Sequence, residues 1–366
     1  MKLRLARKCR NESGIALIIV MISILVLGLL AGRFAYSMKV ETTLARNANS
    51  EMELEWIGRS GVEYARWILV QQASCPAEPY DALSQIWAGG SSGPCATNAG
   101  LSEVQKEFQL GRGSFTWKIT DLESKFNINS TASPGGEQIL QQGLLVMGVD
   151  AGDMGPIVSS IQDWIDDNDQ TRMQGAENEY YHTLPSPYEA KNGPIDDLSE
   201  LLMVKEITPE IYWGNGSTNR QSAALRQLHN KFAKPDEAPS YACGLVDLFT
   251  PISSGRININ TASSEVLQLI PGIDPPTADA IVAGRQGEDD GSGMLGPYPT
   301  VDAVRRLPEV NPFVINALRQ YGATRSTAFQ VTIDAKIGSY TRQFVAILGR
   351  SPGNPRDVQI LNFYWK

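Results

Sequence analysis

From Gly14 to Gly32 the chain carries no charged residue, and this apolar run constrains the fold more than any other feature. At a rise of about 1.5 Å per residue, a helix over this run covers most of a hydrocarbon core of roughly 30 Å. Five basic residues and one acidic residue precede it, which orients the N-terminus toward the cytoplasm by the positive-inside rule. We therefore expect a single-pass anchor in the inner membrane of a double-membrane bacterium, with the bulk of the chain in the periplasm.

The apolar run is predicted to continue without a break into an amphipathic helix that ends near Gln72. No proline occurs between Gly14 and Pro76, and small or apolar residues recur there at helical spacing: Leu54, Ile57, Gly61, Ala65 and Ile68. Residues 15–35 would span the membrane, and residues 36–72 would pack on a soluble domain. The alternative is an anchor followed by a separate helix. A secretory signal is disfavoured because "LLAGRFA" makes a poor cleavage site.

The rest of the chain is acidic. The formal charge is −8, and residues 1–14 hold five of the 32 basic residues against one of the 40 acidic ones, so the remainder is more negative still. Such a surface repels nucleic-acid phosphates and anionic lipids. Calcium or basic protein partners suit it better.

Period-two patterns predict strands at both ends of the soluble part. "SFTWKITD" (114–121), "AFQVTIDAKIG" (328–338), "RQFVAILGR" (342–350) and "VQILNFYWK" (358–366) alternate apolar and polar residues, and the turns between them suit an antiparallel meander. We expect an α+β fold in which residues 73–125 supply a loop and the first strand or strands. Residues 126–325 would form an inserted all-α domain, and residues 326–366 would complete the sheet.

An internal repeat organises the helical domain. "FNINSTAS" (126–133) recurs as "ININTASSEVL" (257–267), and each copy is followed by helical patterns around a Gly-apolar-Asp turn. The second turn resembles the hairpin of helix-hairpin-helix DNA-binding proteins, except that Asp274 replaces its second glycine, as Asp150 does in the first copy. A carboxylate there would face the phosphate that the hairpin receives. We interpret both turns as helix-packing devices and expect no nucleic acid partner.

A basic leader that ends in glycine, followed at once by an apolar helix, resembles the signal of type IV pilins and type II secretion pseudopilins. The resemblance implies that a prepilin peptidase cuts after Gly14, which ends the 1–14 leader, and methylates the new N-terminus at Ile15. Most members of that family carry Glu at the fifth mature position, where this chain has Ile19. A carboxylate at membrane depth costs a few kcal/mol unless it is paired. An apolar residue there points to a subunit with no neighbour above it, as in the minor pseudopilin K family.

The segment 163–204 resembles that family most closely, with "DWID", Asp169, "GAE" and "YY" in matching order. It also holds hard oxygen donors around a flexible loop, namely Asp166, Asp169, Glu177 and Glu179, which are ligands that calcium prefers. The resemblance implies a bound calcium ion. The alternative is an acidic helix end with a solvated loop, because the spacing is not that of an EF-hand. A second acidic loop, "GEDDGSG" (287–293), is more simply a solvated turn.

Cysteine usage suits an oxidising compartment. Cys75 and Cys95 flank a loop rich in Pro, Gly and Ser, which makes them candidates for a disulfide. Cys9 lies in the leader, and Cys243 is left as either a buried thiol or a member of a different pair. The two histidines, His182 and His229, accompany no serine elbow, phosphate loop or zinc spacing, so no enzyme is expected.

The resemblance as a whole implies a pilin-like α+β fold and a non-enzymatic minor pseudopilin at the tip of a type II secretion pseudopilus. Its partners would be other minor pseudopilins through the N-terminal helix, the prepilin peptidase, and the outer-membrane secretin or secreted substrates. Two alternatives stay open from the residues: a minor pilin of a type IV pilus, and a periplasmic DNA-binding protein that uses the hairpin at 271–274.

Overall fold

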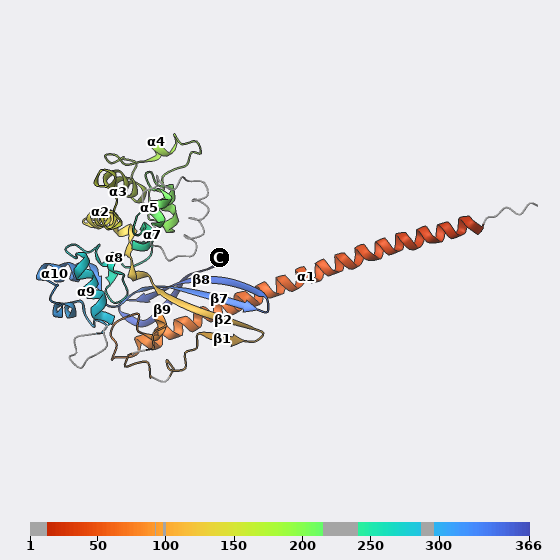
Figure 1. Ribbon diagram of the computed structural model, residues 1–366, viewed down its shortest axis with the longest axis horizontal. Helices are drawn as coiled ribbons and strands as arrows, with labels where there is room; N and C mark the ends of the chain where they lie inside the picture. The colour runs from red at the N-terminus through yellow and green to blue at the C-terminus, as the bar shows by residue number, and fades with distance from the viewer. Residues whose placement is uncertain (1–12, 92, 98–99, 215–240, 287–295) are drawn as a thin grey trace, which may run out of the picture.

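The N-terminal helix α1 dominates the shape of the molecule. The computed structural model describes residues 13–91, 93–97, 100–214, 241–286 and 296–366. Within these ranges α1 runs without interruption from Ser13 to Ala73, 61 residues, and ends one residue beyond the predicted Gln72. Its first half projects away from the rest of the chain as a bare rod, and its second half lies against the sheet (Figure 1).

Five strands form one antiparallel sheet in the order β1-β2-β7-β8-β9. Their bounds are Glu107–Leu110, Gly113–Asp121, Ala328–Ile337, Tyr340–Ser351 and Asn354–Trp365. The α+β class and the antiparallel meander of the last three strands are therefore confirmed. The short edge strand β1 was not individually predicted. Alternation works as expected on β2, where Phe115 and Ile119 are buried and Thr116 and Lys118 are exposed.

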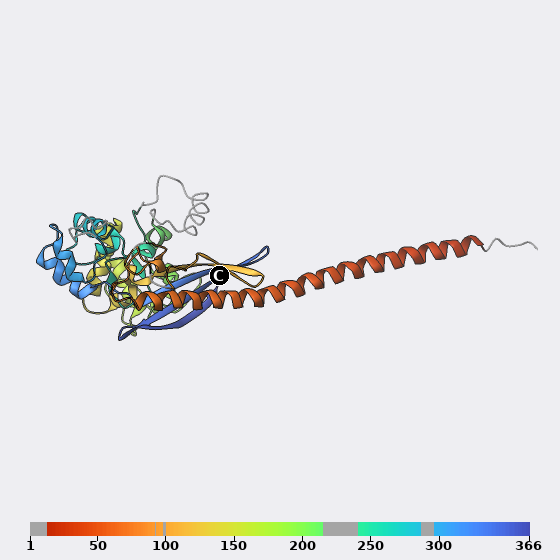
Figure 2. The same ribbon diagram turned by 90° about the horizontal axis from the view of Figure 1, so that it is seen from below.

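One face of this sheet is covered by the second half of α1, as the turned view shows (Figure 2). Leu54, Ile57, Ala65, Ile68 and Leu69 of the helix are buried in the same core as the inward-facing residues of β2, β7 and β8. Two helical glycines permit the close approach. A Cβ at Gly58 would meet the Phe344 ring at 2.4 Å, and one at Gly61 would meet Ile333 at 2.8 Å.

The helical part of the chain lies in sequence between β2 and β7. It gathers beyond the end of the sheet from which the free half of α1 points away (Figure 1). Its α-helices are α2 (Gly136–Met147), α3 (Ala151–Ile165), α4 (Asn178–Tyr181), α5 (Pro209–Trp213), α7 (Leu245–Leu248), α8 (Ser264–Leu267), α9 (Pro275–Gln286) and α10 (Pro312–Tyr321). These helices share a second apolar core, separate from that of the sheet.

Short 3-10 helices connect these elements: η1 (Ile86–Ala88), η2 (Leu122–Ser124), η3 (Ile128–Ala132), η4 (Leu198–Met203) and η5 (Val301–Arg306). Two small parallel pairs of strands close the helical part into units. β3 (Phe126–Asn127) pairs with β4 (Phe249–Thr250), and β5 (Ile257–Asn258) pairs with β6 (Gly322–Ala323). Each pair begins at one copy of the sequence repeat. We call residues 126–250 the first unit and residues 257–323 the second unit.

Candidate functional site

The free first half of α1 begins with a long uncharged surface, from Gly14 to Gly32. Among the described residues one helix is long and apolar enough to cross a membrane, and its most apolar stretch is not covered by any other described residue. Ile15 and Ile19 lie in this stretch, and Ile19 is 58% exposed. Among the described residues none covers Ile19, so lipid or another molecule would be needed to bury it.

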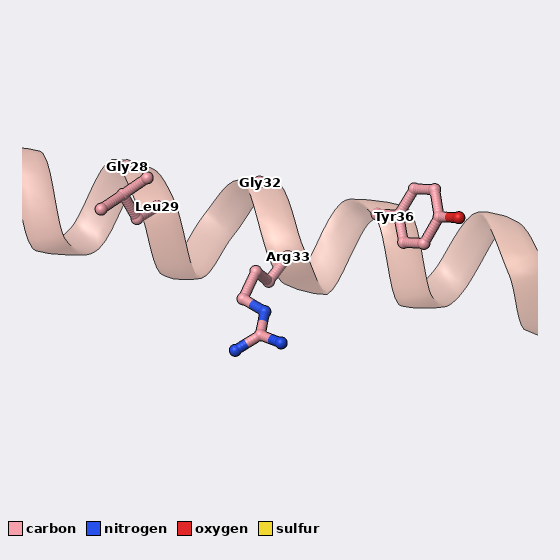
Figure 3. Close-up of a pocket in the computed structure, with 5 residues that line it drawn as sticks. All are labelled: Gly28, Leu29, Gly32, Arg33 and Tyr36. Atoms are coloured by element: carbon pink, nitrogen blue, oxygen red, sulfur yellow. The ribbon is translucent and has the colours of Figure 1, made fainter.

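Gly28 and Gly32 form a shallow hollow on this helix (Figure 3). They lie one turn apart, and a Cβ at either position would meet nothing within 4 Å. Leu29, Arg33 and Tyr36 complete the lining of the hollow (Figure 3). Two glycines at this spacing in an apolar helix allow a second helix to approach closely. The spacing is readable from the sequence, although no role was predicted for the two glycines.

The acidic loop after α3 folds back on Asp163, a residue that the sequence did not single out. Its carboxylate is fully buried at the C-terminal end of α3 and accepts hydrogen bonds from the backbone N–H of Ala176 at 2.9 Å and of Arg172 at 3.2 Å. The Arg172 guanidinium also donates to Asp163 Oδ1 at 2.8 Å and contacts Asp166. The loop therefore closes around one buried carboxylate and one arginine.

Asp169 lies across this loop from Asp166. Its Oδ1 accepts from Asn178 Nδ2 at 2.8 Å and from Asn192 Nδ2 at 3.3 Å. Asn178 in turn accepts from the Ala190 N–H at 2.7 Å through its Oδ1. These contacts join the start of the loop to the segment that returns from α4.

Glu177 is the most unusual residue of the acidic loop. It is only 2% exposed, yet both of its carboxylate oxygens lack a hydrogen-bond partner among the described residues, as does Oδ1 of Asn192. Burial, together with the charges of Asp163, Asp166 and Asp169, raises the pKa of Glu177 to about 7. A buried carboxylate without partners costs free energy, and a cation is one group that would offset this cost.

The predicted ligand set is only partly brought together. Asp166 and Asp169 act electrostatically on Glu177, whereas Glu179 is exposed in the first turn of α4. Within the described ranges no three side chains of Asp, Glu, His or Cys converge as a ready-made ligand set. Arg172 occupies part of the space between the carboxylates, so the arrangement is acidic but not preassembled. The loop 287–293, with Glu288, Asp289 and Asp290, lies outside the described residues.

An asparagine clamp recurs in the two units. Asn129 exchanges two hydrogen bonds with the backbone of Ile195, at 2.7 Å from its N–H and 3.0 Å to its C=O. Asn260 does the same with Tyr298, at 2.8 and 2.9 Å. In both units a second asparagine, Asn127 or Asn258, lies two residues before the clamping asparagine. Its Oδ1 accepts a hydrogen bond from the backbone N–H of the clamping asparagine. The sequence repeat thus encodes the same local architecture twice.

The two Gly-apolar-Asp turns pack helices. Gly148 ends α2 at a φ of +88°, and its N–H and that of Val149 satisfy carbonyls of the last turn. Gly272 has a φ of +86°, and Asp274 Oδ1 accepts from the Thr277 N–H at 3.0 Å, which caps the start of α9. Hydrogen bonds from the Thr277 side chain and from its backbone N–H lower the pKa of Asp274. The carboxylate that replaces the glycine is thus an N-cap.

A buried charged cluster joins the sheet to the second unit. Asp121, at the end of β2, accepts from Asn258 at 3.1 Å, Thr261 at 2.6 Å and Ser326 at 2.7 Å. Asp81 pairs with Arg350 of β8 at 2.6 Å. Burial raises the pKa of Asp121 to about 7, although its hydrogen bonds oppose the shift.

The loop between α1 and β1 is fastened covalently. Cys75 and Cys95 form a disulfide with their Cα atoms 6.2 Å apart. Glu78, buried beside it, accepts from Gln85 at 2.8 Å and from the Cys95 N–H at 3.0 Å. Cys243 is a free buried thiol, and burial raises its pKa to about 12. Its burial and raised pKa make it unreactive.

Several comparisons with known proteins find similarity to type II secretion system protein K. A family model described as type II secretion system protein K matches residues 124–213, and a model of the helix-hairpin-helix motif matches residues 253–319. The type II secretion system protein K of Aeromonas hydrophila is 23% identical over 94% of this chain and 95% of its own length. That of Pseudomonas aeruginosa is 23% identical over 93% of this chain and 90% of its own length.

A relative from Escherichia coli strain K12 is 25% identical over 55% of this chain, and the chain spans 60% of that relative's length. Among solved structures, a chain in the GspK–GspI–GspJ complex of enterotoxigenic Escherichia coli aligns with a TM-score of 0.62 at 19% identity. The alignment covers 88% of this chain and 99% of that one. At this identity the likeness shows a shared fold.

Proposed function

We propose that this chain, which is similar to type II secretion system protein K over most of its length, is a non-enzymatic minor pseudopilin that caps the tip of a secretion pseudopilus. In this role it starts assembly and supports the export of folded proteins across the outer membrane. α1 anchors it in the inner membrane by a single pass, and the sheet and helical part lie in the periplasm. The prepilin peptidase cuts between Gly14 and Ile15, near the start of α1.

The observation that carries the tip position is the uncharged fifth mature residue. Ile19 is exposed on α1, within a stretch that carries no charged residue from Ile15 to Gly32. A carboxylate here needs the N-terminal amine of a subunit stacked above it, since an unpaired charge at this depth costs a few kcal/mol. Ile19 removes that cost for the one subunit that has no neighbour above.

The shape of the soluble part supports the same position. In a pilin-like arrangement, α1 covers one face of the sheet and the helical part is inserted between β2 and β7. The helical elements lie beyond the end of the sheet that is distant from the membrane half of α1 (Figure 1). A subunit of this width at its far end leaves no surface on which a narrower subunit would stack.

The proposed partners within the membrane are the helices of other minor pseudopilins. The hollow at Gly28 and Gly32 supports this, because a bare backbone surface lets a second helix pack at short range. At the far end, the secretin or secreted substrates would meet the helical part.

We also propose that the acidic loop binds one calcium ion. Asp166, Asp169 and Glu177 would supply carboxylate oxygens, and Asn192 an amide oxygen, since Glu177 and Asn192 hold oxygens without partners. Calcium accepts six to eight oxygen ligands in flexible geometry, which suits a loop of this kind. The ion would neutralise repulsion among the carboxylates and fix the loop. Glu179 is left out of this set because it is exposed.

Calorimetric titration of the full-length protein in detergent micelles tests the calcium site. Glu177→Gln removes a ligand charge and should weaken calcium binding by at least about 30-fold. Glu179→Gln is the matched control in the same loop and should bind within about twofold of the parent. Equal binding by the parent and Glu177→Gln, or no calcium binding at all, would contradict the proposal.

Deletion of the gene tests the system in which the protein works. Loss of protein secretion with twitching motility retained is expected for type II secretion, and the reverse would indicate a type IV pilus.

The variant Ile19→Glu tests the tip position. With no amine above it, the new carboxylate should reduce secretion and the amount of protein in the membrane, whereas Ile19→Leu should not. Cross-linking that finds a subunit stacked above Ile19 would refute capping.

A further inference from the structure

Strand β9 is a long edge of the main sheet; Pro355, Arg356 and Asp357 protect its first part, and its register against β8 shifts at Leu361. It spans Asn354–Trp365 and lies last in the strand order, next to β8. From Val358 to Trp365 it contains neither a charged residue nor a proline, the residues with which proteins protect exposed edges. The opposite edge, β1, is only four residues long.

The hydrogen bonds of β9 show which backbone groups face outward. The Lys366 N–H donates to the Gln343 carbonyl of β8 at 3.0 Å. Because backbone direction alternates in an antiparallel pair, Phe363 and Trp365 direct their N–H and C=O groups away from β8. The side chains along this edge are accessible, with Leu361 62% and Trp365 63% exposed. The arrangement is a template for one more strand.

A cleft on the outer face of the sheet reaches this edge. It has a volume of about 650 Å³ and lies between the outer face of the sheet and the first unit. Ile347 of β8 and Asn362 and Tyr364 of β9 line the sheet side, and Tyr212 and Trp213 of α5 line the opposite side. A strand added to β9 would therefore direct every second side chain toward this cleft.

The cleft has an acidic wall. Asp197 lines it, and its charge acts on both Tyr212 and Tyr364, which lie on opposite sides. Asp197 accepts hydrogen bonds from Ser199, but no cation pairs with it among the described residues. Asp196, also on the wall, pairs with Lys191, and Lys366 lines the cleft without an ion pair to Asp197. The carboxylate of Asp197 is therefore available to a basic group.

We propose that β9 and this cleft bind an extended peptide segment of a partner protein, one with alternating apolar side chains and a lysine or arginine that reaches Asp197. Backbone hydrogen bonds to Phe363 and Trp365 would supply affinity, and the cleft would supply specificity, as in other cases of strand addition. The site does not depend on the proposed place at a pseudopilus tip, because it requires only the sheet and the first unit.

Fluorescence anisotropy with the full-length protein in detergent micelles tests the site. The probe is a labelled octapeptide of alternating valine and threonine with one lysine in place of a threonine. N-methylation of one alternate set of its amides should weaken binding at least about tenfold, whereas methylation of the other set should change it less than about threefold. Replacement of the lysine by norleucine should weaken binding about fivefold. Equal binding by both methylated peptides, or no binding of the parent peptide, overturns the proposal.

Variants of the protein locate the site on β9. Trp365→Pro removes an outward N–H and leaves the ladder to β8 intact, so it should abolish binding. If that variant does not fold, Leu361→Lys introduces a charge on the edge and should weaken binding at least about tenfold. Leu145→Lys, at a similarly exposed leucine of α2, is the control and should bind normally. Unchanged peptide binding by the β9 variants would overturn the proposal. Self-association of the protein that Leu361→Lys abolishes would also overturn it, because the edge would then bind a second copy of this chain.

Discussion

The two units of the helical part share a scaffold but differ in what they attach to it. Both begin with a two-residue strand, clamp a later segment with an asparagine, and close with a parallel strand. The first unit places residues 166–194 between α3 and the clamped Ile195, whereas the second places only residues 287–297 between α9 and the clamped Tyr298. The unsatisfied oxygens of Glu177 and Asn192 lie in the longer insertion.

The hydrogen-bonding groups of the two clamps are satisfied, whereas those of the acidic loop are not. The clamp recurs because two loops need the same backbone support, and it is satisfied in both units. The acidic loop is not satisfied, since it holds a buried carboxylate without partners. Buried polar groups without partners occur in this loop and not in the described part of the second unit, and they are the observation on which the proposed calcium site rests.

The largest expected effect of a single substitution comes from removing the clamps. Asn260→Ala leaves the N–H and C=O of the buried Tyr298 without partners and should lower the free energy of unfolding by about 3 kcal/mol. Asn129 is less buried, so Asn129→Ala should cost about 2 kcal/mol. Urea denaturation of the full-length protein measures both. Equal tolerance of both variants would mean that the repeated hydrogen bonds do not stabilise the units.

Calcium should act on the first unit alone. At a calcium concentration 100 times the dissociation constant, the free energy of unfolding should rise by about 2.7 kcal/mol. Hydrogen exchange should slow in residues 163–193, and addition of EDTA should reverse the change. Equal protection of the second unit would show that the ion does not distinguish the two.

Acidity should act on the attachment of the second unit. In the folded protein the pKa of Asp121 is raised to about 7, whereas an ordinary Asp carboxyl, as in the unfolded chain, has a pKa of about 3.8. Between these two values the folded state holds a proton that the unfolded state releases. The free energy of unfolding should therefore fall as pH rises from about 4 to about 7, by on the order of 4 kcal/mol, and level off above about pH 7. Asp121→Asn should flatten that slope, as measured by urea denaturation across pH. A slope that persists unchanged would assign it to other groups.

The smallest effects compare the two glycine turns. Gly148 and Gly272 both have positive φ, so alanine at either position should cost about 1 kcal/mol. At Gly272 the new Cβ would also meet the Phe313 ring at 2.5 Å, whereas at Gly148 it would meet nothing within 4 Å. Gly272→Ala should therefore cost about 1 kcal/mol more, and Phe313→Ala should relieve that excess. Thermal unfolding of the single and double variants checks this.

The sequence predicted those elements whose signal is local and periodic. α1 follows from an apolar run without proline, and β2, β7, β8 and β9 follow from alternation long enough to define a face. β1 was missed because four exposed residues carry no pattern. Loop acidity was visible, but Asp163 was not, because it lies inside a helix and acts on residues 172 and 176.

Contacts between residues far apart in the chain could not be predicted from the sequence, for a different reason. Asp81 meets Arg350, and Asp121 meets Asn258 and Ser326, only because the sheet and the second unit come together in space. The repeat itself was recognised, yet the clamping role of Asn129 and Asn260 depends on segments that lie far along the chain. Burial of Glu177 likewise follows from the packing of its loop.

The bare half of α1 also has a mechanical consequence. About 40 residues precede the first buried contact of the helix at Leu54, which corresponds to a lever of roughly 60 Å. A tilt of about 5° where the helix meets the sheet would displace its far end by about 5 Å, roughly one helical turn. Small rotations of the sheet and helical part are thereby converted into sideways movement of the free end of α1, and a pull along α1 is transmitted to the sheet through a single continuous helix.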